Sequence, residues 1–596
     1  MRRIVGVALA ALVWGSVTGV ADVAPGRAAP PAPSAPPAPP TCSPPSSGYG
    51  AAIRRYVPFH NRYGELIAVD LYLPTDAAGS TLTDAGCQFP VVLESSPYRD
   101  WETPQPTKVT EDARRSWWVR RGYVYAFADV PGTGGSDGTW CLFCEHEQWS
   151  GFDVVEALGT MPGSNGNVGM IGGSYPGINS LLVAQRQPPH LKAVIAAQFF
   201  VDPYSDLYFV GGMRRLLDST VLGVAFTGLA KWTGQYQAPT SAEEFQRFTD
   251  VWTSRAKAPP PSFASIQDDH PIRDDWYEER TVRPEQITVP AYLLGGWNDI
   301  FDRATWGVYE RLSSAVKVLR QGPFTHVSIY TPPGAWPCAS HDSDFCGAPM
   351  FDRFLKGDAT PDYQAMVATP VKYYVQPSGA TPAAPYVEGA AKPATTPWTM
   401  ALGPPGKTAA THWDPSVGVT SGQWFLRGSV GGAQPPYDYY LGFDSPADQR
   451  IEEGKELSVA SPPLAHDVTV VGGGSLSLLA ASSGTDADVV VRLVDEYPAG
   501  DKVFPAGYAY LVTNGWLRAS HRSGQDATHI APLQPGLPTR LDVEVWPAGY
   551  RFLAGHRIRV DIAAADVPRF APLSSPFDLT IDLGASSVTL PTVSSP

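Results

Sequence analysis

The chain of 596 residues has little charge: charged residues make up only 17% of it, below the ~25% that is usual for soluble proteins. Basic residues are scarcer than acidic ones, with 44 Lys and Arg against 58 Asp and Glu, and the formal net charge is −14. Nucleic-acid-binding proteins normally carry a basic surface, so this balance argues against that class. No internal repeat is present, and the length excludes a disulfide-stapled mini-protein.

Cysteines are also few, and they do not form a zinc-binding pattern. Cys141 and Cys144 form a C-x-x-C pair, but no second C-x-x-C or C-x-x-H completes a zinc site, and no thioredoxin-like context surrounds the pair. An even number of cysteines favours disulfides in an oxidising compartment. Proximity in the sequence favours three pairs, namely Cys338–Cys346, Cys141–Cys144 and, by elimination, Cys42–Cys87.

A long apolar run occurs at the amino terminus, and no later run resembles a membrane span. Arg2 and Arg3 precede an apolar stretch from Ile4 to about Ala21, and small residues follow it. This layout over residues 1–29 predicts a secretory signal peptide and thus a secreted protein. A membrane anchor is the alternative, but Gly, Ser and Thr residues interrupt the stretch, and the Arg pair also fits twin-arginine export. We expect no stable membrane insertion after signal cleavage.

Residues 30–49 are dominated by Ala, Pro and Ser, which cannot bury enough apolar surface to fold, so they predict an extended linker. Beyond this linker, apolar runs alternate with helix-length segments, which predicts a parallel sheet covered by helices. The predicted strands cover residues 65–74, 89–98, 123–130, 168–174, 289–297 and 316–324.

Residues 200–285 interrupt this alternation. They are rich in Trp, Tyr and charge with a helical period, so they predict a helical cap inserted between two parts of an α/β core, at 50–199 and 286–360. From 365 to 596, short apolar runs alternate with Gly and Pro turns, which predicts a β-sandwich or jelly roll.

A Gly-rich segment over residues 131–138 resembles a phosphate-binding loop only superficially. It lacks the G-K-[ST] ending of a P-loop and does not spell G-x-G-x-x-G. We interpret it as a tight surface turn.

A serine stands at a sharp turn between a predicted strand and a predicted helix, in Gly172-Gly173-Ser174-Tyr175-Pro176-Gly177. A serine on such a turn projects above the sheet, as in a nucleophile elbow. The strict G-x-S-x-G pattern fails by one place, because Pro176 precedes Gly177. A plain glycine-rich turn is the alternative, but the strand–turn–helix context favours a nucleophile.

Two further residues complete the set that a serine nucleophile requires. Asp299 and His326 each follow a predicted strand, where open α/β sheets place their sites. A serine needs an imidazole to take its proton and a carboxylate to orient that imidazole. The order Ser174, Asp299, His326 is that of α/β-hydrolases.

Each of these two positions has an alternative. Asp299 could cap a helix, with Asp302 as the acid. His341 could replace His326, but it lies in the loop between Cys338 and Cys346.

In sequence, these motifs resemble the cocaine-esterase-type acyl hydrolases and the X-Pro dipeptidyl peptidases. The resemblance spans roughly residues 50–575 and implies an α/β-hydrolase core with an inserted helical cap and a C-terminal all-β jelly-roll domain. It also implies an oxyanion hole made of the Tyr98 hydroxyl and the backbone N–H of Tyr175. The segments that carry it are GGSYPG, GGWND, GPFTH, SPYR, RGYVYAFADVPGTGGSDG, NGNVGMIGGSYPG, HPIRDDWYEER, FDRFLKG, GWLRASHR and GHRIRVDIAAADVPRF.

The sequence therefore predicts a secreted serine hydrolase that cleaves an ester or amide bond of a small molecule or peptide through an acyl-enzyme, with no metal or organic cofactor. An Xaa-Pro dipeptidyl peptidase is the alternative enzyme, and it would need an acid, such as Asp202 or Asp206, to bind a free ammonium group. A non-catalytic secreted binding protein is the alternative of another class, although it would not need Ser, Asp and His together. The sequence contains no signal for an oligomeric state.

Overall fold

The structure is a computed structural model, and it describes residues 42–43, 48–98, 113–216, 220, 222–223, 226, 228, 242–257, 262–326, 347–377, 386–415, 448–452, 454–499, 507–567 and 569–594. The predicted signal peptide, most of the predicted linker, and both Cys338 and Cys346 lie outside the described residues. Among the described helices, none is long and apolar enough to cross a bilayer.

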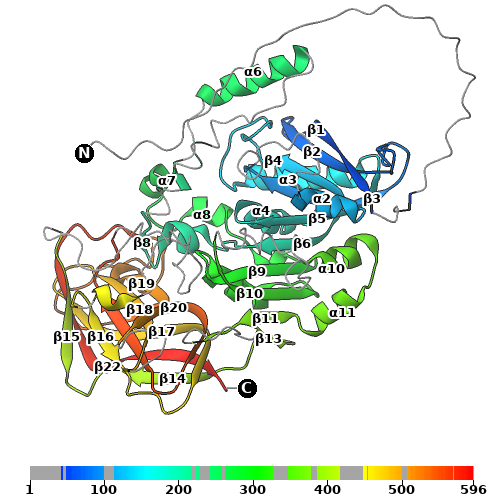
Figure 1. Ribbon diagram of the computed structural model, residues 1–596. Helices are drawn as coiled ribbons and strands as arrows, with labels where there is room; N and C mark the ends of the chain where they lie inside the picture. The colour runs from blue at the N-terminus through cyan, green and yellow to red at the C-terminus, as the bar shows by residue number, and fades with distance from the viewer. Residues whose placement is uncertain are drawn as a thin grey trace, which may run out of the picture. The chain divides into compact units, whose positions relative to one another are not determined.

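A ten-stranded sheet organises the first part of the chain, with strand order β1-β2-β4-β3-β5-β6-β9-β10-β11-β13 (Figure 1). Neighbours from β4 to β11 are parallel, whereas β1, β2 and β13 pair in the antiparallel sense. The bounds are β1 Gly50–His60, β2 Leu66–Thr75, β3 Phe89–Ser96, β4 Val124–Asp129, β5 Ser164–Gly173, β6 Leu191–Ala197, β9 Ala291–Asn298, β10 Lys317–Thr325, β11 Val371–Tyr374 and β13 Tyr386–Gly389.

Both faces of this sheet are covered, because its inner strands are apolar on both sides. In β3, Val91 and Leu93 pack with residues of α3 and α4, whereas Val92 between them packs with residues of α2 and α10. Burial of every residue along a strand is typical of parallel sheets with helices on both faces. The helices of this part are α2 Ala113–Arg120, α3 Glu145–Thr160, α4 Tyr175–Ala184, α9 Asp302–Val308, α10 Ala348–Phe351 and α11 Pro361–Ala368.

The segment between β6 and β9 adds short elements instead of strands to the main sheet. It hydrogen-bonds to the C-terminal part of the chain: the N–H of Leu216 donates to the carbonyl of Arg569, and the N–H of Ala571 donates to that of Arg214. Its described elements are a π-helical turn at Tyr204–Tyr208, β7 Phe209–Val210, β8 Met213–Arg214, α6 Ala242–Lys257, α7 Phe263–Asp269, α8 Asp275–Glu279 and a 3₁₀ turn at Pro284–Gln286.

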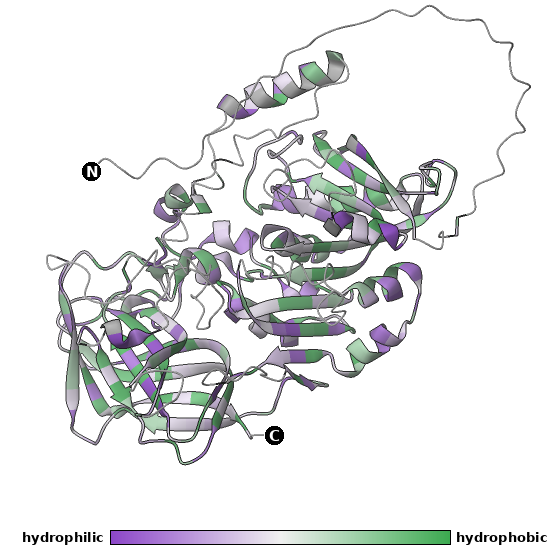
Figure 2. Cartoon of the chain, viewed as in Figure 1, coloured by the Kyte–Doolittle hydropathy of each residue, from purple (hydrophilic) through white to green (hydrophobic). Residues whose placement is uncertain are grey.

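The C-terminal part is all β, and its two main sheets share one hydrophobic core. In β22, Leu579, Ile581 and Leu583 are buried and alternate with polar residues, as a strand with one face on a core requires. Figure 2 shows this alternation of hydrophobic and hydrophilic residues along the strands of the domain. One sheet contains β12 Gln376–Pro377, β20 Thr539–Phe552, β17 Val468–Ser482, β22 Phe577–Val593, β14 Thr396–Ala401 and β15 Thr408–Trp413, and the other β16 Leu457–Ala460, β21 Arg557–Ala563, β18 Asp488–Glu496 and β19 Ala509–Arg518.

Two disulfides are present among the described residues, Cys42–Cys87 and Cys141–Cys144. Both pairings are those predicted from the sequence. The third predicted pair, Cys338–Cys346, stays a prediction.

The Gly-rich segment at 131–138 is not the surface turn that the sequence predicts, because residues 131–136 are buried. The N–H of Gly135 donates to the carboxylate of Asp129 at 2.7 Å. The guanidinium of Arg255, on α6, donates to three carbonyls of the turn at 2.6–2.7 Å. In an exposed turn, water would bind these carbonyls. Here the side chain of Arg255, about 120 residues away in the sequence, binds them instead.

Candidate active site

Ser174 lies between β5 and α4 in a backbone conformation that few side chains adopt, with φ of 60° and ψ of −128°. Glycines on either side allow the chain to turn this sharply. A Cβ on Gly172 would lie 2.2 Å from the Cβ of Pro176, and a Cβ on Gly177 would lie 2.5 Å from the carbonyl oxygen of Ala197. Both glycines therefore stand where a side chain would clash, and the second of them is at position 177, one place beyond that of G-x-S-x-G.

The structure brings Ser174, Asp299 and His326 together beyond the carboxyl ends of β5, β9 and β10. The Nε2 atom of His326 lies 2.9 Å from Oγ of Ser174, and its Nδ1 atom lies 2.9 Å from Oδ2 of Asp299. Asp299 is 1% exposed and His326 is 8% exposed, so the hydrogen bond between them is shielded from water. This arrangement can take a proton from the hydroxyl and hold the imidazole in one orientation.

Asp302, the alternative acid, lies in a different environment. Its Oδ1 atom accepts a hydrogen bond from the N–H of Arg303 at 2.5 Å, and the carboxyl is fully buried. Burial raises the pKa of Asp302 well above its ordinary value. The geometry thus favours Asp299 over Asp302 as the partner of His326. His341, the alternative base, lies outside the described residues.

Gln198 is a member of the site that the sequence analysis missed. It follows β6 and is fully buried, and its Nε2 atom donates to Oδ2 of Asp299 at 2.7 Å and to the carbonyl of Thr325 at 2.9 Å. Its amide therefore connects the ends of three strands. A glutamine after a strand belongs to no catalytic motif, and the sequence contains no signal for this role.

The two groups predicted for an oxyanion hole lie beside the serine. The hydroxyl of Tyr98, which follows β3, is 3.5 Å from Oγ of Ser174. Tyr175 is the first residue of α4, where backbone N–H groups have no acceptor within the helix. Both groups can therefore donate to an oxygen atom that is held near Ser174.

A pocket of about 490 Å³, its open mouth included, lies over the serine, and its wall is predominantly aromatic. Apart from the tyrosine hydroxyls, Ser174, His326 and Arg280 are the polar members among the described lining residues, and no described carboxylate lines it. The guanidinium of Arg280 stacks over the ring of Trp276, with 3.9 Å to its centroid. The aromatic and aliphatic members are Tyr98, Leu142, Phe143, Tyr175, Ile178, Phe200, Pro203, Leu207, Tyr208, Leu222, Phe226, Phe263, Trp276, Ile300 and Phe301.

Two family models match most of the chain. Residues 64–328 match the family model described as X-Pro dipeptidyl-peptidase (S15 family), and residues 366–593 match the model of the X-Pro dipeptidyl-peptidase C-terminal non-catalytic domain. The cocaine esterase of Rhodococcus sp. is 25% identical over 580 residues, which cover 88% of this chain and 92% of that protein. The chain belongs to the cocaine-esterase-type and X-Pro dipeptidyl-peptidase-like serine hydrolases.

Solved structures show that the hydrolase has the fold predicted from its sequence. An alpha-amino acid ester hydrolase superposes with a TM-score of 0.71 at 20% identity, over 92% of this chain and 97% of that one. An aminopeptidase from a marine sediment archaeon, Thaumarchaeota archaeon, superposes with a TM-score of 0.71 at 19% identity, over 93% of this chain and 98% of that one. The α/β-hydrolase core and the C-terminal all-β domain are thus confirmed.

Behind the pocket, the hydrolase has a buried hydrogen-bond network on the side chain of Tyr175. Nε1 of Trp140 donates to the Tyr175 hydroxyl at 2.7 Å, and that hydroxyl donates to the carboxylate of Glu147 at 2.8 Å. Burial raises the pKa of Glu147 from 4.5 to about 7, although the hydrogen bonds from Tyr175 and from the N–H of Phe143 lower it. The sequence analysis named neither Glu147 nor Trp140, because neither belongs to a motif.

Proposed function

We propose that this protein is an exported serine esterase or amidase that accepts an apolar acyl group. Ser174 is the nucleophile, His326 is the general base and acid, and Asp299 orients the imidazole. The observation that supports this proposal most strongly is the distance of 2.9 Å on each side of the His326 ring, to Ser174 and to Asp299.

In the proposed reaction, His326 takes the hydroxyl proton of Ser174 as Oγ attacks the acyl carbon. The hydroxyl of Tyr98 and the N–H of Tyr175 donate to the oxyanion that develops. His326 then gives its proton to the leaving alcohol or amine, which leaves an acyl-enzyme on Ser174. A water molecule, deprotonated by His326, attacks this ester, and His326 returns the proton to Oγ of Ser174 as the bond to the acyl group breaks and the acid is released.

The composition of the pocket favours an apolar acyl group over the free amino terminus that a dipeptidyl peptidase binds. Such an ammonium group needs an acid, and the described lining residues include none. The two acids proposed from the sequence are engaged elsewhere: Asp206 forms an ion pair with Arg303 at 2.5 Å, and Asp202 forms one with Arg273 at 3.0 Å. Aromatic walls suit apolar acyl groups.

Export is part of the proposal. It is supported by the layout of residues 1–29 and by two disulfides, which persist in oxidising compartments. The test is the amino-terminal sequence of the protein recovered from culture medium. Intact protein that starts at Met1 and stays inside the cell would contradict it.

The deciding experiment compares kcat/KM for p-nitrophenyl acyl esters with kcat/KM for Ala-Pro-p-nitroanilide. Because esters are intrinsically easier to cleave, an N-acetylated Ala-Pro-p-nitroanilide is the matched control, and Ser174→Ala is the control for background hydrolysis. We expect ester cleavage that depends on Ser174, and no preference for the free amine over the acetylated anilide. Fast cleavage of the free-amine anilide that acetylation abolishes would establish the exopeptidase instead.

A further inference from the structure

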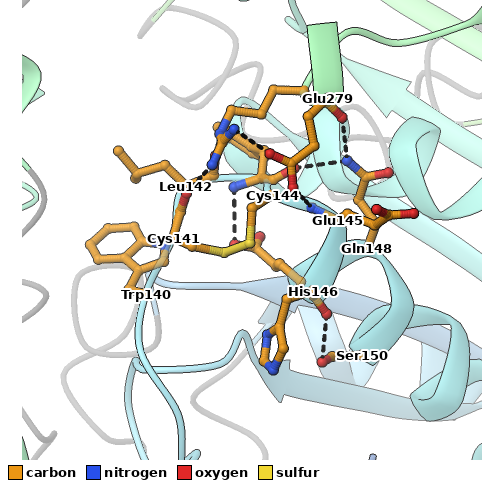
Figure 3. Close-up of a disulfide and its surroundings, with 12 residues drawn as sticks. Trp140, Cys141, Leu142, Cys144, Glu145, His146, Gln148, Ser150 and Glu279 are labelled. Carbon is orange, nitrogen blue, oxygen red and sulfur yellow. Dashed lines mark hydrogen bonds and ion pairs between the residues drawn. A yellow bond between two sulfur atoms is a disulfide. The ribbon is translucent and has the colours of Figure 1, made fainter. Parts of the chain in front are cut away.

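The Cys141–Cys144 disulfide closes a loop whose two inner residues have a left-handed backbone. Leu142 has φ of 54° and Phe143 has φ of 67°, and neither is glycine. Side chains disfavour this region, so two such residues in succession require contacts that hold them there. The disulfide joins the two ends of this strained pair (Figure 3).

Two buried polar side chains outside the loop donate hydrogen bonds to its carbonyls. The guanidinium of Arg280 donates to the carbonyl of Leu142 at 2.9 Å and to that of Cys141 at 3.2 Å. Nε2 of Gln148 donates to the carbonyl of Phe143 at 2.8 Å and to that of Glu279 at 3.0 Å. Figure 3 shows the Gln148 side chain beside Glu279, with a dashed line for the hydrogen bond between them. The carbonyls of both residues between the two cysteines are therefore held by side chains outside the loop, namely Arg280, which follows α8, and Gln148 on α3.

The loop and the residues beside it enclose the side chain of Tyr175. The ring of Phe143 stacks on that of Tyr175, with 3.8 Å between centroids and 25° between planes. Trp140 donates to the Tyr175 hydroxyl from one end of the loop, and Glu147 accepts from that hydroxyl at the other end. Tyr175 directly follows Ser174, so the position of its ring is coupled to the backbone of the elbow.

We propose that the segment Trp140–Glu147, closed by the Cys141–Cys144 disulfide, is a positioning element for the reaction, because it holds Tyr175 and thereby the N–H that donates to the oxyanion. This inference rests on the proposed function of Ser174. It makes Phe143 a positioning residue that acts through Tyr175.

A comparison of the two disulfides supports a local role for this one. A disulfide stabilises a fold mainly by restricting the unfolded chain, and the effect grows with the length of the closed loop. Cys42 and Cys87 are 45 residues apart, whereas Cys141 and Cys144 are three apart. The short disulfide therefore contributes less to the stability of the whole fold than the long one, and its contribution lies in the local backbone that it fixes.

The test compares Cys141→Ser/Cys144→Ser with the matched variant Cys42→Ser/Cys87→Ser. The readouts are Tm, kcat and KM for p-nitrophenyl acetate, and the rate constant for labelling of Ser174 by a fluorophosphonate. For the first variant we expect kcat and the labelling rate to fall on the order of 10- to 100-fold, the usual cost of a small misplacement, with KM little changed. For the second we expect the larger fall in Tm, with kcat preserved.

An unchanged kcat and labelling rate in Cys141→Ser/Cys144→Ser would overturn the inference, and so would an equal loss of kcat in the other variant. If the first variant does not fold, Phe143→Ala keeps the disulfide but removes the stacked ring, and it should lower kcat for the acetyl ester; an unchanged kcat would overturn the inference as well. A wild-type protein that is not labelled at Ser174 would instead refute the proposed function itself.

Discussion

The side-chain amide of Gln198 donates to Oδ2 of Asp299, the same oxygen that lies 2.9 Å from Nδ1 of His326. The other oxygen, Oδ1, accepts the N–H of Phe301 at 2.7 Å. Three hydrogen-bond partners therefore fix the orientation of one buried carboxylate. A carboxylate in this fixed orientation can accept the Nδ1–H of His326, with Nε2 facing Oγ of Ser174.

Ser174→Ala and His326→Ala are each expected to remove nearly all hydrolysis, because the residues act as one unit. Turnover should fall by several orders of magnitude in each variant, and the double variant should be hardly worse than either single one. Steady-state kinetics of the three variants, with circular dichroism to verify folding, provide the test. Losses that multiply in the double variant would contradict the pairing of the two side chains.

Asp299→Asn is expected to lower turnover by on the order of 10⁴, because the amide would hold the imidazole in the wrong tautomer. Asp302→Asn is the matched control three residues further on. The Asp302 carboxyl accepts a hydrogen bond from the N–H of Arg303, whereas the partner of His326 is Asp299, so an amide of the same shape at 302 should leave turnover nearly unchanged. If Asp302→Asn proves to be the damaging change, the acid has been misassigned.

Tyr98→Phe is expected to lower kcat by roughly 10²–10³, the usual cost of one lost oxyanion donor. The phenyl ring keeps the packing of Tyr98 against Tyr175 and Phe226, so Tm should hardly change. Parallel measurements of kcat and Tm separate the two roles of the side chain. A lower Tm with normal turnover would indicate that Tyr98 only packs.

Glu147 is expected to make the stability of the fold depend on pH. Burial raises its pKa from 4.5 to about 7, so between these values the folded chain keeps a proton that the unfolded chain has lost. The stability contributed by this group is complete below pH 4.5 and is lost as the pH rises through about 7. At about 1.4 kcal/mol per pH unit, the loss is on the order of 3 kcal/mol.

The measurement is urea unfolding of the wild type and of Glu147→Gln at pH 5 and pH 8. The free energy of unfolding of the wild type should fall relative to that of the variant over this interval. Curves that stay parallel would show that Glu147 is ionised in the folded state throughout.

The positions of Ser174, Asp299 and His326 could be predicted because each follows a strand of the same parallel sheet, and such strands end at one edge. Gln198 also follows a strand, but glutamine takes many roles and its partner lies 101 residues away. Phe143 and Glu147 could not be predicted, because their role depends on how a loop packs against Tyr175. The prediction of a surface turn at 131–136 is wrong. Glycine-rich segments usually face water, whereas here the carbonyls accept hydrogen bonds from Arg255.

Arg303 links the hydrolase part of the chain to the all-β domain, which matters when domains are exchanged between relatives. Its guanidinium pairs with the buried Asp206 of the segment between β6 and β9 and also with Glu544 of β20. A chimera that takes its all-β domain from another sequence replaces Glu544, one of the two partners of Arg303. A substitution of Arg303 leaves the carboxylate of Asp206, which is 2% exposed, without its cationic partner. Exchange of the all-β domain should therefore keep a carboxylate at position 544, and positions 206 and 303 should be changed only together.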